Sequence, residues 1–418
     1  MQNKNLFLLW TGKLVSGLGD KMYAIAIAWW ILELTGSPTI MGFYLLAATL
    51  PMVLFGLVAG AIIDKSNLKR VLIIADVIRG VGITLLGILF LFDSLSLASV
   101  FSITVVLSLA SAFFNPAITS IIPRIVSENE YGKANSLIQL VDGTSKVAGP
   151  FAGVAIVAVS GYSGAFLING ISFLISAFFE GFIHYENKRI IWSKTSSKQL
   201  VGFGAFVTDI KSGLKYVLTN AKLVNLLFYI FIAHFFVGAL SVMIPVMAKF
   251  VSDNDLNLLG TLETVLGGGF IIGAVWLSKI RPEKYKIDSL PTLFVCVGIC
   301  ILGIGVIAFF DWLPVILFAI PVFVIGYCIV NASVKWKTFI QYNTPSEKLG
   351  RVASISALVG DITFPIAFAF YGILLEQLNF VFLTILSGVI LIFLVYTLNR
   401  IFRKNLNLIP VLDNKGLR

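Results

Sequence analysis

Long apolar runs separated by short polar connections make up almost the whole chain. Twelve of these runs reach the length of about 20 residues that a helix needs to cross a bilayer. They form two sets of six around a polar segment, with approximate bounds 6–33, 39–63, 71–92, 97–123, 134–160, 164–184, then 223–250, 257–278, 290–310, 313–338, 351–375 and 379–400. The pattern predicts an all-α membrane protein with twelve transmembrane helices in two six-helix bundles.

The polar segment divides the chain into domains. We expect an N-terminal bundle at 1–185, a cytoplasmic linker at 186–222, a C-terminal bundle at 223–401 and a cytoplasmic tail at 402–418. Within the linker, Phe206, Ile210, Leu214 and Val217 recur at helical spacing, which favours a helix lying on the membrane surface. The segment 132–143 resembles the segment 350–361, and such an internal repeat is typical of two pseudo-symmetric halves.

Composition supports the membrane assignment and narrows the function. The chain is 58% hydrophobic and 12% charged, whereas soluble proteins carry about 25% charged residues. The net charge of +10 does not indicate nucleic-acid binding, because the cations lie between apolar runs. Most Lys and Arg fall at the termini, in the linker and in alternate connections, so we expect a cell-membrane protein with both termini cytoplasmic.

Enzyme chemistry is not expected. The three cysteines lie inside apolar runs without a CxxC pattern, and no phosphate-cradling glycine loop with a lysine is present. The sequence therefore predicts no metal site, no cofactor and no catalytic residue. The expected partners are a small-molecule substrate, protons and the lipid bilayer, and the expected oligomeric state is a monomer.

The connection between the second and third runs concentrates charge beside the membrane. Asn67 tolerates the left-handed backbone of a tight turn, and an acid and several cations flank it. We interpret this connection as a gate on the cytoplasmic side that holds the two halves together when the cavity opens outward. Its residues are Gly60, Asp64, Lys65, Asn67, Lys69 and Arg70, with Asp76 and Arg79 as partners in the next helix.

Seven ionisable residues lie well inside the predicted helices: Lys13, Asp20, Lys21, Asp142, Lys146, Glu263 and Asp361. A charge near the bilayer centre costs about 2.5 to 3.5 kcal/mol, so these side chains must face a cavity or each other. One interpretation is that they form ion pairs that fix helix packing. Asp142 and Lys146, four residues apart, can pair on one helix face, and Lys13 shares a face with Asp20.

The other interpretation is proton coupling. Asp20 lies near the middle of the first helix, where a carboxylate can be desolvated enough to take up a proton near neutral pH. Asp361 is the second candidate and Asp142 the third, with Lys13, Lys21 and Lys146 as charge partners. A proton would let the loaded cavity reorient without moving a bare charge through the membrane potential.

Helix-breaking prolines and nearby aromatic residues suggest a substrate cavity. Pro116 and Pro365 free backbone carbonyl groups that must line protein or water rather than lipid. His234 is a candidate proton relay, although a single buried histidine is also consistent with a structural role. The expected cavity residues are Phe113, Asn115, Tyr229, His234, Asn331 and Trp336.

Several motifs resemble those of the major facilitator superfamily. The loop from Gly60 to Arg70 resembles G-x-x-x-D-[RK]-x-G-[RK]-[RK], with Asn67 in place of the second glycine. Gly149, Pro150 and Gly153 match the antiporter signature G-P-x-x-G that exporters of this superfamily carry in the fifth helix. Further segments resemble the macrolide-efflux branch of the drug:proton antiporters, namely 35–37, 51–56, 75–79, 114–117 and 349–354.

The resemblance implies a twelve-helix exporter that uses the proton gradient to expel lipophilic compounds. One departure concerns coupling, because Leu107 stands where related exporters often carry an arginine. Two alternatives remain open. The same fold exports lysophospholipids or siderophores in related branches, and a non-transporting membrane sensor or assembly partner would show a cavity closed by bulky side chains on both sides.

Overall fold

The computed structural model is built almost entirely from long helices, as the apolar runs predict. It describes residues 4–63, 66–127, 130–184, 214–250, 255–279, 289–310 and 312–407. The N-terminal helices are α1 (Lys4–Thr35), α2 (Pro38–Ile63), α3 (Leu68–Leu91), α4 (Leu97–Ile125) and α5 (Tyr131–Gly181). The C-terminal helices are α7 (Ala221–Phe250), α8 (Leu256–Ser278), α9 (Leu290–Phe309), α10 (Ala319–Asn343), α11 (Ser346–Gln377) and α12 (Phe380–Asn407), with a short 3₁₀ helix η4 (Val315–Phe318) before α10.

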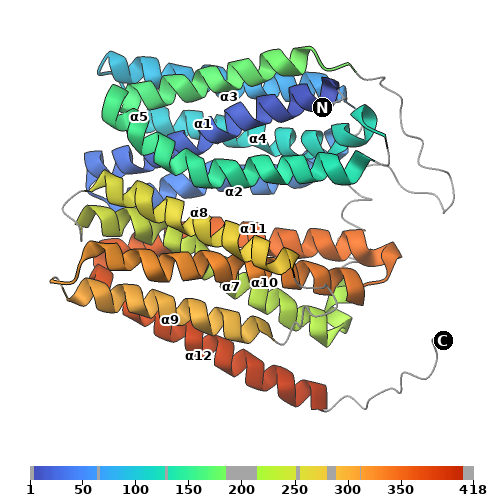
Figure 1. Cartoon of the computed structure of the whole chain (residues 1–418), viewed down its shortest axis with the longest axis vertical. Coiled ribbons are helices and arrows are strands. Elements are labelled where there is room, and N and C mark those ends of the chain that lie inside the picture. Colours follow the sequence, from blue (N-terminus) through green and yellow to red (C-terminus); the bar gives the residue numbers. More distant parts are fainter. Residues whose placement is uncertain are drawn as a thin grey trace.

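The helices form two bundles that lie one above the other in Figure 1, with α1 to α5 in one and α7 to α12 in the other. Helix α1 begins and α12 ends on the same side of the molecule, which we call the termini side. The α1–α2 connection lies on the other side, which we call the opposite side. Residues 186–213 of the linker, with Phe206 and Ile210 of the expected surface helix, lie outside the described residues, whereas 214–219, with Leu214 and Val217, are helical.

Ten segments of the described residues are long and apolar enough to cross a membrane. One of them, Ser136–Gly181, contains 46 residues and bends at Gly161, whose φ of 69° and ψ of −174° are not helical. Glycine adopts this positive φ without the steric penalty that a Cβ brings. With two arms in α5 and with the charged helix α1 added, the described segments are consistent with twelve crossings. The sequence predicted separate helices at 134–160 and 164–184, and the bend at Gly161 lies between these two ranges.

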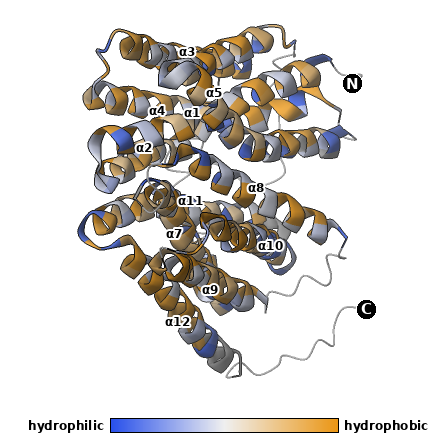
Figure 2. Ribbon diagram, turned by 60° about the vertical axis from the view of Figure 1, so that its left-hand side comes forward, coloured by the Kyte–Doolittle hydropathy of each residue, from blue (hydrophilic) through white to orange (hydrophobic). Residues whose placement is uncertain are grey.

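Apolar residues colour most of the helical ribbon in Figure 2, and hydrophilic residues gather at the helix ends. Side chains such as Phe92, Val159 and Trp312 are 76%, 89% and 78% exposed. In water such surfaces would be unfavourable, but in a bilayer hydrocarbon tails cover them.

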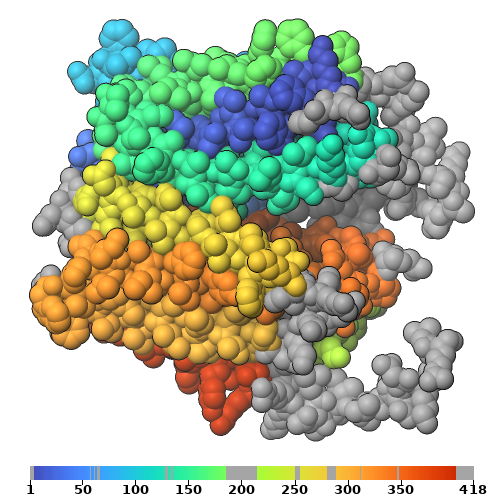
Figure 3. All heavy atoms as spheres, in the orientation of Figure 1, coloured from blue at the N-terminus to red at the C-terminus, as the bar shows by residue number. Residues whose placement is uncertain are grey.

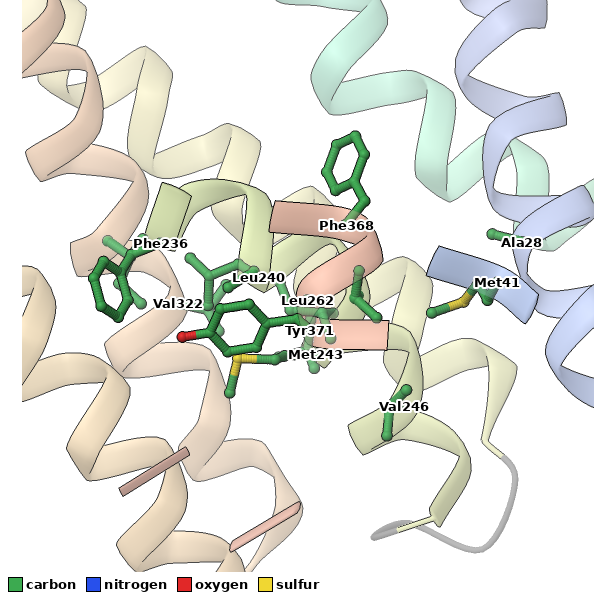
Figure 4. Packing of buried hydrophobic residues seen from close by; sticks show 14 of the residues in the cluster. Ala28, Met41, Phe236, Leu240, Met243, Val246, Leu262, Val322, Phe368 and Tyr371 are labelled. Carbon is green, nitrogen blue, oxygen red and sulfur yellow. The ribbon is translucent and has the colours of Figure 1, made fainter. Parts of the chain in front are cut away.

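Two buried apolar clusters show where the bundles meet. The larger cluster includes Ala28 and Met41 from the N-terminal half together with Met243, Phe368 and Tyr371 from the C-terminal half. In Figure 4 Tyr371 lies among α7 side chains, whereas Met41 and Ala28 approach from the N-terminal half. The second cluster contains only N-terminal residues, from Leu6 to Ile183, and lies toward the termini side. The halves therefore share a continuous core toward the opposite side.

Candidate functional site

A cavity of about 480 Å³ lies between the two bundles. Helices α1 to α5 line it from the N-terminal half, and α7, α8 and α11 line it from the C-terminal half. Its walls are largely apolar and aromatic, with Tyr44, Met52, Leu107, Phe173, Leu259 and Phe368 among the lining residues. An apolar cavity with a few polar groups is the usual form of a small-molecule site.

Four charged side chains border this cavity: Asp20 and Lys21 on α1, Arg79 on α3 and Glu263 on α8. Asp20 and Lys21 are exposed to the cavity, whereas Gly12, Ser16 and Gly19 on the buried face of α1 pack into the N-terminal bundle. The rotation of α1 thus directs Asp20 into the open space, and Arg79 and Lys21 supply the positive charges that act on it. Two acids and two cations give the cavity a balanced charge.

Helices α2 and α11 close the cavity on the opposite side. A Cβ atom at Gly372 would lie 2.9 Å from the Pro38 carbonyl oxygen, and one at Gly42 would lie 3.0 Å from the Gly372 Cα. Only glycine allows two backbones to approach this closely. The Ser37 hydroxyl and the Thr39 N–H both donate to Glu376 Oε2, over 2.6 and 3.2 Å.

Lysine 249 adds a second link on this side. Its ammonium group at the end of α7 donates a hydrogen bond to the Leu32 carbonyl oxygen over 2.6 Å. Carbonyl groups in the last turn of a helix lack intrahelical partners and carry partial negative charge, so a lysine is favourable there. These contacts at the ends of α1, α2, α7 and α11 form the opposite-side seal.

The antiporter signature lies where α1, α5 and α8 meet. A Cβ at Gly153 would lie 3.0 Å from the backbone of Met22, and one at Gly149 would collide with Lys21. Across the same junction, Gly267 of α8 approaches the Lys146 carbonyl oxygen, and Pro150 lines the cavity. The motif therefore sets close packing beside the cavity, and its role in antiport stays a prediction.

On the termini side the bundles separate. Figure 3 shows the surface recessed between α5 and the end of α8 on this side. The protein is thus closed on the opposite side and open on the termini side.

This open state bears on the expected gate. Asn67 caps α3 with an extended backbone, φ −79° and ψ 105°, rather than the expected left-handed one, and its side chain accepts a hydrogen bond from the Arg70 N–H over 3.2 Å. Lys69 and Arg70 lie in the first turn of α3, whereas Asp64 and Lys65 lie outside the described residues. Asp76 and Arg79 pair with each other inside the N-terminal bundle rather than at the surface.

The observed ion pairs differ from those that the spacing of charged residues along one helix predicted. Lys13 Nζ contacts Asp142 Oδ1 at 2.8 Å, so α1 and α5 are linked along their packed faces. The prediction that Asp142 pairs with Lys146 is therefore wrong, because Asp142 pairs with Lys13. Lys146 is exposed, and its ammonium group lies 5.6 Å from the centre of the Phe270 ring on α8.

None of the six expected cavity residues lines the central cavity. Tyr229 is buried and stacks on Phe294, at 5.9 Å between ring centres. Asn331 donates to the Tyr327 carbonyl oxygen over 2.8 Å, and Asn115 Nδ2 lies 3.6 Å from the Met52 sulfur. Phe113 is half-buried against the N-terminal cluster. Helix rotation, which sequence position alone does not fix, directs Tyr229 and Asn331 into packing, whereas Asn115 is exposed beside Met52 of the cavity lining.

His234 and Trp336 instead line a small apolar pocket in the C-terminal bundle. His234 Nδ1 contacts the Ile230 carbonyl oxygen at 2.8 Å, and its ring lies 5.3 Å from Trp336. Asp361 is exposed but does not line the central cavity, and its charge and that of Lys337 act on His234. A relay role for His234 stays a prediction.

Sequence reasoning missed one buried charged group, Glu180 on α5. It is 1% exposed and lies under the influence of the Asp76 and Arg79 charges. Because Glu180 lies at the end of an apolar run, its position is typical of a charged residue at a solvated helix end. The signal was a polar stripe at helical spacing, formed by Asn169, Ser172, Ser176 and Glu180. Within the described ranges, His, Cys, Asp and Glu form no group of three that could hold a metal ion.

Comparisons with known proteins agree with this architecture. The family model described as Major Facilitator Superfamily matches residues 9–368. The chain is 26% identical over 315 residues to the uncharacterized transporter YkuC of Bacillus subtilis, covering 72% of this chain and 71% of that protein. It is 21% identical over 391 residues to macrolide efflux protein A of Streptococcus pyogenes, covering 92% and 93%.

A solved structure has the same fold. The bacterial homologue of the human lysosomal transporter Spinster, in an inward-facing and unoccupied conformation, aligns with a TM-score of 0.72 at 13% identity. The alignment covers 97% of this chain and 99% of that one. The family match, the apolar helices and the two bundles around a central cavity identify the chain as a multi-pass membrane transporter that belongs to the Major Facilitator Superfamily.

Proposed function

We propose that this transporter exports an amphipathic small molecule, such as a macrolide or another drug, by alternating access and in exchange for protons. The observation that carries the proposal is the cavity between the halves, which combines aromatic and apolar walls with the carboxyl groups of Asp20 and Glu263. Such walls suit the apolar part of a ligand, and an acid can bind either a proton or a cationic group.

The contacts at the two sides support alternating access. The opposite-side seal uses glycine packing and a few hydrogen bonds, which can separate without breaking either bundle. Rocking of one bundle against the other around a fixed central site is how many secondary transporters work. In the proposed topology the termini side is cytoplasmic, so the described state is open to the cytoplasm. Export as the direction rests on the antiporter signature around Gly149 to Gly153.

The balanced charge of the cavity favours a drug over a lysophospholipid. A lipid exporter is expected to have a long apolar cavity with few fixed cations, whereas the cations Lys21 and Arg79 border this one together with two acids. The open space between the halves also argues against a non-transporting sensor, for which we expected bulky side chains to close both sides.

Transport by purified protein tests the proposal. The protein is reconstituted in liposomes with an imposed pH gradient, and radiolabelled macrolides, lipophilic cations, lysophospholipids and a siderophore are offered in turn. We expect gradient-dependent movement of a macrolide or lipophilic cation, lost when an ionophore collapses the gradient. Movement of lysophospholipid or siderophore alone would favour the alternative substrates, and no movement of any compound would contradict transport.

A further inference from the structure

A second group of charges lies behind the cavity, between α1, α3, α4 and α5. Asp76 and Arg79 on α3 form an ion pair and are 0% and 6% exposed, and Glu180 on α5 is 1% exposed. The Ser176 hydroxyl lies beside Asp76. We call Asp76, Arg79, Ser176 and Glu180 the buried charge cluster.

The cluster holds more negative charge than its arginine can balance. Arg79 has already paired with Asp76, which leaves the Glu180 carboxylate without a cation of its own. The other elements around the cluster do not supply one among the described residues. Helix α1 contributes Gly12 and the acid Asp20, and α4 contributes the Phe114 ring.

Unpaired atoms point to a missing hydrogen. The carboxylate oxygens Asp76 Oδ2 and Glu180 Oε2 are buried and have no hydrogen-bond partner, and Arg79 Nε, a donor of the same cluster, is also buried without an acceptor. Buried polar atoms in native proteins almost always have a partner, so each such atom needs an explanation. A proton on one carboxyl group removes the uncompensated charge and turns an acceptor into a donor.

The surroundings leave no space for a hydrated ion instead. Arg79 lies between two rings, with its guanidinium carbon 3.9 Å from the centre of Phe114 and 4.4 Å from that of Phe173. On α1, a Cβ at Gly12 would lie 3.0 Å from Ser176 Oγ, so this helix packs directly onto the cluster. The bare proton is the cation that fits.

We propose that Asp76 and Glu180 form a proton-binding site behind the substrate cavity, coupled through Arg79 to Asp20. Arg79 lines the cavity together with Asp20, and on its other side it pairs with Asp76. The negative charge of Asp20 also acts on Asp76. Protonation of the cavity acid therefore changes the field at the buried site. The polar stripe Asn169, Ser172, Ser176 and Glu180 runs along α5 from beside Asp20 to the termini side, where a proton can leave.

The coupling to Asp20 rests on the proposed proton-driven export, but the binding site itself does not. Infrared difference spectra of the reconstituted full-length protein, recorded without substrate at stepped pH, detect protonated carboxyl groups directly. The variants are Glu180→Gln and Asp76→Asn, with Glu130→Gln, a half-buried glutamate outside the cluster, as the matched control. Two cluster variants are used so that poor folding of one leaves the other informative.

We expect a protonated-carboxyl band in the wild type that is lost in Glu180→Gln or Asp76→Asn and kept in Glu130→Gln. In Asp20→Asn the band should titrate at a different pH, because one negative charge near the cluster has been removed. A band unchanged in both cluster variants would overturn the site, and one unchanged in Asp20→Asn would overturn the coupling. If the band behaves as expected while the wild type moves no protons with any compound, the proposed export fails and the binding site stands.

Discussion

Glycine 42 offers a sharp test of the opposite-side seal. In Gly42→Ala the added methyl group would lie 3.0 Å from the Gly372 Cα and against the Phe368 carbonyl oxygen. Carbon atoms prefer about 3.5 to 4.0 Å, so α2 and α11 must move apart by roughly 0.5 to 1 Å. Overpacking of this kind costs about 1 to 3 kcal/mol.

This cost falls on one conformational state. When the transporter opens on the opposite side, α2 and α11 separate there and the methyl group meets no obstacle. A differential cost of about 1 to 3 kcal/mol shifts a two-state equilibrium by about 5- to 150-fold. We therefore expect Gly42→Ala to increase the population that is closed on the termini side.

Distances between spin labels measure this population. One label pair replaces Ser94 and Trp312, which are exposed on the opposite side in different halves, and a second pair replaces Lys133 and Tyr342 on the termini side. Cys296, Cys300 and Cys328 are first changed to serine. In Gly42→Ala we expect a longer component for the first pair and a shorter one for the second.

The matched control is Gly56→Ala, the same substitution in the same helix at a position where a Cβ meets nothing within 4 Å. It should leave both distance distributions as in the wild type. Unchanged distances in Gly42→Ala, in protein that is folded, would refute the assignment of the Gly42–Gly372 contact as a conformational constraint.

Three further experiments probe other contacts. Glu376→Gln keeps the shape of the group that accepts from Ser37 and Thr39 but removes its negative charge beside the α2 N-terminus. We expect the opposite-side seal to lose about 0.3 to 1 kcal/mol of stability. The same spin-label pairs should then shift in the same direction as in Gly42→Ala, but by a smaller amount. Lys13→Gln and Asp142→Asn remove one ion pair, and a double-mutant cycle of thermal unfolding in detergent should give a coupling of up to about 1 kcal/mol, whereas Lys146→Gln with Asp142→Asn should give none. Arg79→Ala leaves Asp76 buried without its partner and should destabilise the folded protein by about 3 to 5 kcal/mol in the same assay. Arg400 is exposed, so the control Arg400→Ala should change the stability by less than about 0.5 kcal/mol.

Much of the fold could be predicted because the bilayer imposes a simple rule on sequence. A crossing helix needs a long apolar run, and the polar connections that separate the runs stand out clearly. The break between 160 and 164 was also predicted, because Ser160, Gly161 and Ser163 interrupt the apolar run, and the non-helical angles of Gly161 lie there. Family resemblance was predicted correctly from short motifs, because these set backbone packing at fixed positions.

The site was predicted less completely because it depends on helix rotation and on pairs between distant residues. Asp20 lines the central cavity, as an acid within an apolar helix suggested. Tyr229 and Asn331, chosen by depth alone, pack inside the C-terminal bundle instead. The partner of Asp142 comes from α1, 129 positions away, which local spacing does not reveal. Glu180 was missed because it lies at a helix end.

The central claim is that Asp20 links drug movement to proton movement. The direct measurement uses liposomes that hold a pH-sensitive dye, with a macrolide added to wild type, Asp20→Asn and Glu33→Gln. Glu33 is the matched control, since it lies in the same helix but accepts a hydrogen bond from Tyr162 away from the cavity lining.

The account predicts macrolide-dependent proton flux in the wild type and Glu33→Gln, and none in Asp20→Asn. Equal proton flux in Asp20→Asn and the wild type would contradict it.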